Sequence, residues 1–314
     1  MAYDGIVTMA VAHELSDSIT MGKIDKVYQP ESDELVLNIH TKNGNRKLFA
    51  SVNPAASRLH LTCENIQNPP APFSFCMLMR KHIQNGRITS VHQKDSERII
   101  EIDIETLNEL GFAVSKRLIF EIMGKHSNIV LTDISTGKII DAIKHISIDV
   151  NRVRQILPGL VYQYPPVQDK IPFKKVTENT SIPADPKGIQ RTIGGISPAF
   201  AEELSHEDDP HLRLRNVISA VSQGIISPVV YSDGKNSPKE FYLTPLAEYE
   251  DVCQVTRFDD MESCLEYFYS NKKSTNKLNQ KASSLIRSVT SQIDKLHLKE
   301  QRLKEDLLKA ENSE

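Results

Sequence analysis

The sequence predicts an α+β fold in which a mostly antiparallel β-sheet with two helices occupies residues 1–170. Three observations support this prediction. Short segments in which apolar and polar residues alternate are separated by turn-forming residues. Two other segments of the same region carry apolar residues at helical spacing. The residues from 272 onward have apolar positions three and four apart, which is typical of a coiled coil.

A helix is expected over residues 4–19 at the start of the chain. Asp4 suits its N-cap, because a carboxylate accepts hydrogen bonds from the free N–H groups of a first helical turn. Apolar residues four positions apart then form one face: Val7, Val11, Leu15 and Ile19. This face is expected to pack against the sheet.

Period-two alternation predicts the strands. The dipeptide Asn43–Gly44 favours a tight hairpin between the second and the third of them. A second helix is expected over residues 72–83, with basic residues in its last turn and Gly86 as a stop signal. The predicted strands of this region are 23–29, 35–39, 46–52, 87–93, 97–105, 117–123, 128–133 and 138–145.

Six prolines interrupt the next stretch, so residues 158–186 are predicted to form a linker. Helical patterns follow it. Gly194 and Gly195 allow a tight turn between two short helices. Ser197 is expected to cap a helix whose first residue is Pro198, where a missing N–H group costs nothing.

Strand patterns return over residues 228–257, and a short helix is expected over 259–269. The predicted coiled-coil arm follows, and residues 272–314 carry ten Lys and Arg against six Asp and Glu. Since the net charge of the chain is -3, the residues before the arm are acidic overall. Composition therefore excludes a globally basic nucleic-acid binder, and contacts with phosphates must come from local patches.

Neither a membrane span nor a signal peptide is predicted, because no long apolar run occurs and acidic residues interrupt the N-terminal region. We expect a cytoplasmic protein without membrane contact. The four cysteines form no C-x-x-C pair and are predicted to be small core residues. No catalytic group, metal site or cofactor is expected. Glu101, Asp103 and Glu105 share one strand face, which is predicted to be a solvated edge, and Gly124–Lys125 lacks the further glycine of a phosphate-binding loop.

Ordered motifs occur along nearly the whole chain. They are Asp4–Gly5, Glu14–Leu15, Tyr28–Gln29–Pro30, Asn53–Pro54, Arg58–Leu59–His60–Leu61, the stretch from Phe75 to His82, the stretch from Glu97 to Ile100, the stretch from Glu121 to Asn128, Leu157–Pro158–Gly159 and Tyr164–Pro165–Pro166. In this order the motifs resemble those of the NFACT family, which is also catalogued as fibronectin-binding protein A-like.

The resemblance implies an architecture. The first domain is expected to be similar to the N-terminal domain of formamidopyrimidine-DNA glycosylases, and it maps to residues 1–175 and 228–271. A helix-hairpin-helix domain maps to residues 184–227, and the first part of a long coiled-coil hairpin maps to residues 272–314. The C-terminal RNA-binding domain of the family is absent from this sequence, so the chain is expected to be the N-terminal part of a longer protein.

The resemblance also implies a function in ribosome-associated quality control. Family members bind an obstructed large ribosomal subunit that still carries peptidyl-tRNA, hold a tRNA there, and promote template-free addition of C-terminal residues. In bacterial members this residue is alanine, which makes alanine tRNA the expected partner. Because the ribosome supplies the peptidyl-transfer centre, no enzymatic chemistry of the chain itself is implied. DNA is not an expected partner.

The family ties an acidic–Arg pair and a Glu–Ile–Met stretch to tRNA engagement. These correspond here to Glu97, Arg98, Glu121, Ile122 and Met123. Arg98 heads a predicted strand, where its guanidinium group can bind a phosphate or stack on an unpaired base. Glu121 can accept hydrogen bonds from base amino groups, and Met123 can pack on a base. Glu97 departs from the family pattern, which has Asp at this position.

Two further pairs are candidates for phosphate contacts. Lys125 and His126 lie in a predicted hairpin loop, for which a solvated turn is the better explanation, although such a loop can also touch a phosphate. Gly194 and Gly195 precede the capped helix, whose N–H groups can face a phosphate, although a purely structural hairpin needs the same residues.

Two other functions stay open. The family has been described as a surface adhesin for fibronectin, against which the lack of a signal peptide argues. The glycosylase-like fold also suggests a nucleic-acid-processing enzyme. The chain begins with Met1–Ala2–Tyr3, however, and therefore lacks the N-terminal proline nucleophile and the neighbouring glutamate of those enzymes.

Overall fold

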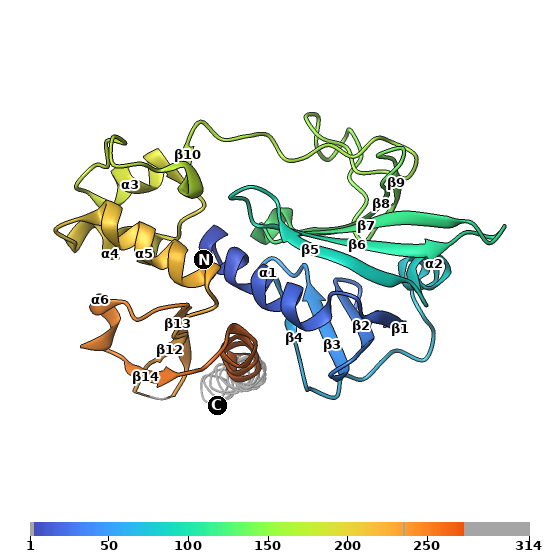
Figure 1. Cartoon of the computed structure of the whole chain (residues 1–314), viewed down its shortest axis with the longest axis horizontal. Coiled ribbons are helices and arrows are strands. Elements are labelled where there is room, and N and C mark those ends of the chain that lie inside the picture. The colour runs from blue at the N-terminus through green and yellow to red at the C-terminus, as the bar shows by residue number, and fades with distance from the viewer. Residues whose placement is uncertain (1–2, 235, 273–314) are drawn as a thin grey trace, which may run out of the picture. The chain divides into compact units, whose positions relative to one another are not determined.

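The computed structural model describes residues 3–234 and 236–272, and its largest feature is a nine-stranded sheet (Figure 1). The strand order is β4-β3-β2-β1-β5-β6-β7-β8-β9, and all neighbours pair antiparallel. The bounds are β1 Lys23–Tyr28, β2 Glu34–Thr41, β3 Gly44–Ser51, β4 Arg58–Leu61, β5 Arg87–Gln93, β6 Ile99–Leu107, β7 Ala113–Glu121, β8 Asn128–Asp133 and β9 Ile139–Ala142. This confirms the α+β class with a large antiparallel sheet.

The junction between β1 and β5 divides the sheet into two halves, since these strands meet only at the pair Lys23 and Arg87. Within each half, strands that are consecutive in the sequence pair with each other. In the predicted hairpin between β2 and β3, Lys42 and Asn43 form the turn, and Gly44 is the first residue of β3 and pairs with Thr41. Gly44 has φ of 106°, a conformation that glycine adopts without the steric cost of a side chain.

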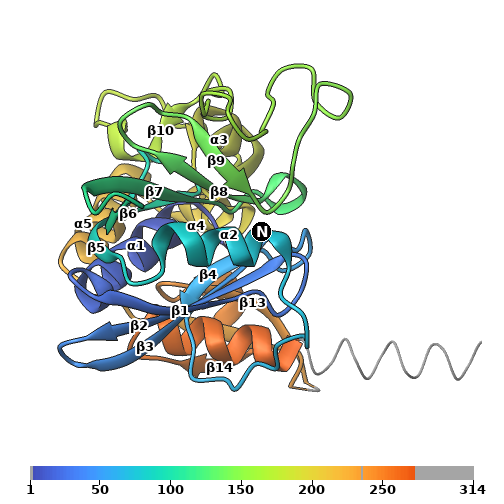
Figure 2. The same ribbon diagram turned by 90° about the vertical axis from the view of Figure 1, so that its right-hand side faces the viewer.

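Two helices pack on the sheet. The first, α1 (Gly5–Ile19), contacts β5 and β6 of one half and β2 and β4 of the other, so it lies between the halves (Figure 2). The residues of its predicted apolar face are buried, and Val11, Leu15 and Ile19 are at most 2% exposed. The second, α2 (Ser74–Ile83), packs on β1, β6 and β9.

The residues predicted as a linker are partly packed. They contain a short strand, β10 (Ile171–Pro172), and a 3₁₀ turn, η2 (Phe173–Lys175), in which the Phe173 side chain is completely buried. β10 pairs in parallel with β11 (Ile193–Gly194). The stretch between the two regions therefore contains a short strand and a buried side chain.

Three helices follow in the region where helical patterns were predicted. They are α3 Pro186–Thr192, α4 Pro198–His206 and α5 Pro210–Ser222. The predicted cap of α4 is confirmed, because the Ser197 hydroxyl accepts a hydrogen bond from the N–H group of Phe200, and Pro198 is the first helical residue. The assignment of residues 184–227 to a helix-hairpin-helix domain stays a prediction.

A second, three-stranded sheet has the order β13-β12-β14. Its strands are β12 Val229–Ser232, β13 Pro238–Tyr242 and β14 Gln254–Arg257, with the short helix α6 Ala247–Glu250 between the last two. A final helix begins at Met261, whose N–H group donates to the Glu14 carboxylate of α1 at 2.7 Å. Apart from residue 272, the predicted arm lies outside the described residues.

Several smaller predictions can be compared with the structure. Cys76 and Cys264 are buried as predicted, whereas Cys63 is exposed. Glu101 is not on a solvated edge, because β6 is an inner strand and the residue is only 1% exposed. Within the described residues, the structure contains no helix of the length and apolar character that a membrane crossing requires.

Candidate functional site

A cavity of about 710 Å³ lies at one end of the β5–β6 pair. Four segments line it: residues 4–5 at the start of α1, the turn 94–99 between β5 and β6, the stretch 164–175, and the turn 194–198 before α4. These segments are separated in the sequence, so the cavity that they line exists only in the folded chain. Its volume lies in the range of about 300–1,000 Å³ that is typical of sites for small ligands.

The buried carboxylate of Asp4 joins three of the surrounding elements. One oxygen accepts hydrogen bonds from the N–H groups of Ile6 and Val7 at 2.9 Å, which caps α1. The other accepts from the N–H group of Ser197 at 2.7 Å and from the Tyr242 hydroxyl at 3.2 Å. Burial raises the pKa of Asp4, and these hydrogen bonds oppose the rise. The predicted cap is confirmed, and the same group also fixes the start of α4.

The glycines beside Asp4 allow close approach of three backbone segments. The N–H group of Gly5 donates to the Gly195 carbonyl at 2.8 Å. A Cβ atom at either glycine would lie 2.6 Å from the Ser96 carbonyl oxygen, which is closer than real Cβ contacts come. Gly195 also has φ of +85°, a conformation that favours glycine. The absence of side chains at Gly5 and Gly195 therefore lets these backbone segments lie close together in the cavity lining.

Glu97 and Arg98 both line the cavity. The Glu97 side chain is exposed and the Arg98 side chain is half-buried. Burial lowers the pKa of Arg98, and the nearby charges of Asp4 and Glu97 counteract this effect. The backbone of this turn is held on the sheet, because the Arg98 carbonyl accepts from the N–H group of Ile122 at 2.8 Å.

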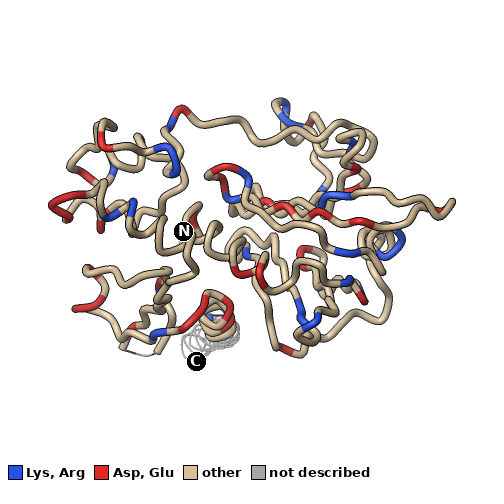
Figure 3. The backbone as a smooth tube through the Cα atoms, in the orientation of Figure 1, with Lys and Arg blue, Asp and Glu red and all other residues tan. Residues whose placement is uncertain are grey.

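Four lysines add to the positive charge around Arg98. Lys94 pairs with Asp95 at 3.1 Å, and its ammonium group lies 5.0 Å from the centre of the Tyr164 ring. Lys174 donates to the Asp95 carbonyl at 2.6 Å, and burial lowers its pKa. The other two are Lys170 and Lys175. Elsewhere basic and acidic positions are interspersed along the described chain (Figure 3), so this local group is the kind of patch that the composition requires.

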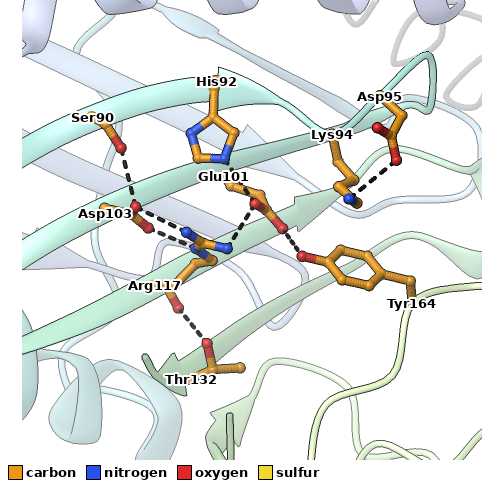
Figure 4. A network of polar contacts seen from close by, with 9 residues as sticks. All are labelled: Ser90, His92, Lys94, Asp95, Glu101, Asp103, Arg117, Thr132 and Tyr164. Carbon is orange, nitrogen blue, oxygen red and sulfur yellow. Dashed lines mark hydrogen bonds and ion pairs between the residues drawn. The ribbon is translucent and has the colours of Figure 1, made fainter. Parts of the chain in front are cut away.

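One wall of the cavity is held by a polar network around the buried carboxylate of Glu101 (Figure 4). The Glu101 carboxylate accepts from the Tyr164 hydroxyl at 2.5 Å and from His92 at 2.9 Å, and it pairs with Arg117 at 3.1 Å. Arg117 also binds Asp103 through two hydrogen bonds. Burial would raise the pKa of Glu101, but these partners hold it below the ordinary value. The stretch that carries Tyr164 is thereby fixed against β6.

The structure does not place the Glu–Ile–Met stretch in the cavity lining. Glu121 is 1% exposed, and its carboxylate binds Arg154 through both oxygens and accepts from the Tyr162 hydroxyl at 2.6 Å. Ile122 is 2% exposed, and Met123 packs against the hydrophobic core. Their contact with RNA stays a prediction.

Of the residues predicted to contact phosphates, one pair lies outside the cavity lining and the other lies in it. Lys125 and His126 are exposed in the 3₁₀ turn η1 (Gly124–His126) between β7 and β8, outside the cavity lining. Gly194 and Gly195 line the cavity together with Glu97 and Arg98. The lysines and Tyr164 were not predicted as site residues, although the Tyr164–Pro165–Pro166 motif marked one of the segments that carry them.

Comparisons with known proteins settle the family. The family model described as NFACT N-terminal and middle domains matches residues 4–314. The chain belongs to the NFACT family. The resemblance stated from the ordered motifs is therefore confirmed.

Individual relatives in the sequence comparison are named Rqc2 homolog RqcH. The chain is 34% identical over 327 residues to the protein named Rqc2 homolog RqcH from Bacillus subtilis (strain 168), and 32% identical over 323 residues to the Rqc2 homolog RqcH of Streptococcus suis (strain 05ZYH33). Both alignments cover 100% of this chain and 56% of the relative, so the chain spans just over half the length of these NFACT proteins.

The fold is also similar to the solved structure of the N-terminal part of the fibronectin/fibrinogen-binding protein from Streptococcus suis. The TM-score is 0.74 at 32% sequence identity, and the match covers 86% of this chain and 99% of that one. This likeness supports the architecture described above.

Proposed function

We propose that this chain is the N-terminal part of a factor that binds tRNA and the large ribosomal subunit in ribosome-associated quality control. The whole protein would promote template-free addition of C-terminal alanine to stalled nascent chains, with alanine tRNA as its partner. Support comes from relatives named Rqc2 homolog RqcH, which align with the whole of this chain.

One observation carries the assignment of the site: Arg98 and four lysines line one cavity together with three acidic residues, Asp4, Asp95 and Glu97, so the lining is net basic in a chain whose net charge is -3. A guanidinium group can bind a phosphate through two hydrogen bonds or stack on an unpaired base, and lysines supply point charges to the backbone. The volume of about 710 Å³ suits unpaired nucleotides rather than a duplex. We therefore propose that single-stranded residues of a tRNA enter here, where Gly194 and Gly195 belong to the lining.

The proposed role is positioning without covalent chemistry. Holding a tRNA beside the peptidyl-transfer centre raises its effective concentration, and this alone can accelerate tailing. The described part of the chain contains no group of three His, Cys, Asp or Glu side chains arranged to hold a metal ion. The proposed domains are residues 1–175 with 228–271, residues 184–227 and residues 272–314, in a protein of the cytoplasm.

Recovery of tRNA with the purified protein tests the site. Arg98→Ala should reduce the tRNA that copurifies, while the thermal unfolding temperature stays close to that of the parent chain because the side chain is only half-buried. Arg87→Ala is a matched control, since Arg87 is exposed on β5 and does not line the cavity. Equal tRNA recovery from the parent and both variants would contradict the assignment. Sequencing of the recovered RNA would identify which tRNA is bound.

A second candidate function comes from the name of the Streptococcus suis structure, which describes a fibronectin/fibrinogen-binding protein. Binding of fibronectin would require exposure at the cell surface. Digestion of the protein when intact cells are treated with protease would favour this function, and protection would favour the ribosomal one.

A further inference from the structure

We infer that Glu121, Ile122 and Met123 are positioning residues, which hold two walls of the cavity in place and do not themselves touch RNA. The inference rests on the proposed function, because it concerns the site at which tRNA is thought to bind. It assigns a different role to the stretch that the sequence predicted to contact RNA directly.

Both oxygens of the Glu121 carboxylate accept hydrogen bonds inside the protein. Its side chain is 0% exposed, and its two oxygens receive hydrogen bonds from the two terminal nitrogens of Arg154 and from the Tyr162 hydroxyl. Arg154 itself is 8% exposed. Moving the carboxylate toward RNA would leave a buried guanidinium group without this partner, which is strongly unfavourable.

The stretch lies directly behind Arg98. Glu121 is the antiparallel partner of Ile99, the residue after Arg98. The N–H group of Ile122 donates to the Arg98 carbonyl at 2.8 Å. Met123 packs against the core cluster that contains Ile99. Through these contacts the stretch fixes the backbone from which the Arg98 side chain projects.

Through Arg154, Glu121 is also connected to the wall that carries Tyr164. Besides binding Glu121, Arg154 donates from Nε to the Gln163 carbonyl at 2.5 Å and lies 5.1 Å above the Tyr162 ring. The rings of Tyr162 and Tyr164 are in edge contact, with centroids 5.1 Å apart. Tyr164 then lines the cavity and donates to Glu101. A continuous set of contacts therefore joins Glu121 to the wall that faces the cavity.

A double-mutant cycle distinguishes positioning from direct contact. Tyr162→Phe removes only the hydroxyl that binds Glu121, and Tyr162 does not line the cavity. We expect Tyr162→Phe and Glu121→Gln each to weaken binding of alanine tRNA by about three- to tenfold, and the double variant to be no weaker than the weaker single one. If Glu121 touches RNA directly, Tyr162→Phe will leave the affinity unchanged, and this result would overturn the inference.

Hydrogen exchange supplies a readout that does not depend on RNA. In Glu121→Gln the amides of residues 160–168 should exchange faster in the free protein, and those of β2 and β3 should not. Loss of tRNA affinity with unchanged exchange would overturn the inference in favour of direct contact. Faster exchange without loss of affinity would overturn it as well. If Arg98→Ala also retains tRNA, the proposed function fails with it, whereas loss in Arg98→Ala alone leaves that function standing.

Discussion

Replacement of Asp4 by Ala is expected to destabilise the protein far more than loss of an ordinary helix cap. The cap of α1 is worth about 1 kcal/mol. The substitution would also leave the Ser197 N–H group and the Tyr242 hydroxyl without their acceptor in the interior, at about 1–3 kcal/mol each. Burial of the Asp4 carboxylate is itself unfavourable, as its raised pKa shows, so removing the carboxylate offsets part of this loss. We expect a net loss of about 3 kcal/mol in the free energy of unfolding.

Urea titration of the variants measures this loss, and a thermal scan should show a midpoint lower by about 6 °C or more. Asp185→Ala is the matched control, because Asp185 is an exposed helix cap that accepts only from the Gly188 N–H group, at 2.8 Å. It should cost about 1 kcal/mol. If the two variants are equally stable, Asp4 is an ordinary cap, and the argument that it joins α1, α4 and β13 is refuted.

Two further predictions concern protons and salt. Burial raises the pKa of Glu14 to about 7 from 4.5, so the folded state binds this proton more tightly than the unfolded chain, and stability falls as the pH rises through this interval. Glu14→Gln should flatten the stability–pH curve between pH 5 and about pH 7.5 in urea titrations, and a curve parallel to that of the parent would contradict this. Affinity for tRNA should fall with salt concentration, and Lys175→Gln should reduce the magnitude of the slope of log affinity against log salt concentration by about one. Lys138→Gln changes an exposed residue outside the cavity and should leave this slope unchanged. Equal slopes in both variants would exclude a phosphate contact by Lys175.

Features that depend on a few neighbouring residues were predictable from the sequence. The Asp4 cap, the Asn43–Gly44 hairpin and the cap at Ser197 each combine a turn-forming or capping residue with the segment beside it. The strand β4 was missed. It has only four residues, Arg58–Leu61, and the sequence of such a short segment gives almost no period-two signal. Its strand conformation is evident only from its pairing with β3.

The walls of the cavity were not predictable, because they depend on contacts between distant residues. Tyr162 and Tyr164 lie in a stretch whose prolines indicate a linker, yet their hydroxyl groups bind glutamates 41 and 63 positions away. The burial of Glu101 has the same origin. Alternation along β6 identifies the face on which Glu101 lies, but only the fold shows that the Tyr164 hydroxyl binds its carboxylate there.

Glu97 stands at a position where the resemblance to the family implies Asp. The turn that carries it is fixed by its backbone: the Glu97 N–H group donates to the Lys94 carbonyl at 2.9 Å, and its own carbonyl accepts from the Gln93 amide at 2.9 Å. The Arg98 carbonyl is held by Ile122. Glu97 is exposed, and none of these bonds involves its side chain. The placement of Arg98 therefore depends on the buried residues behind it rather than on the length of its acidic neighbour.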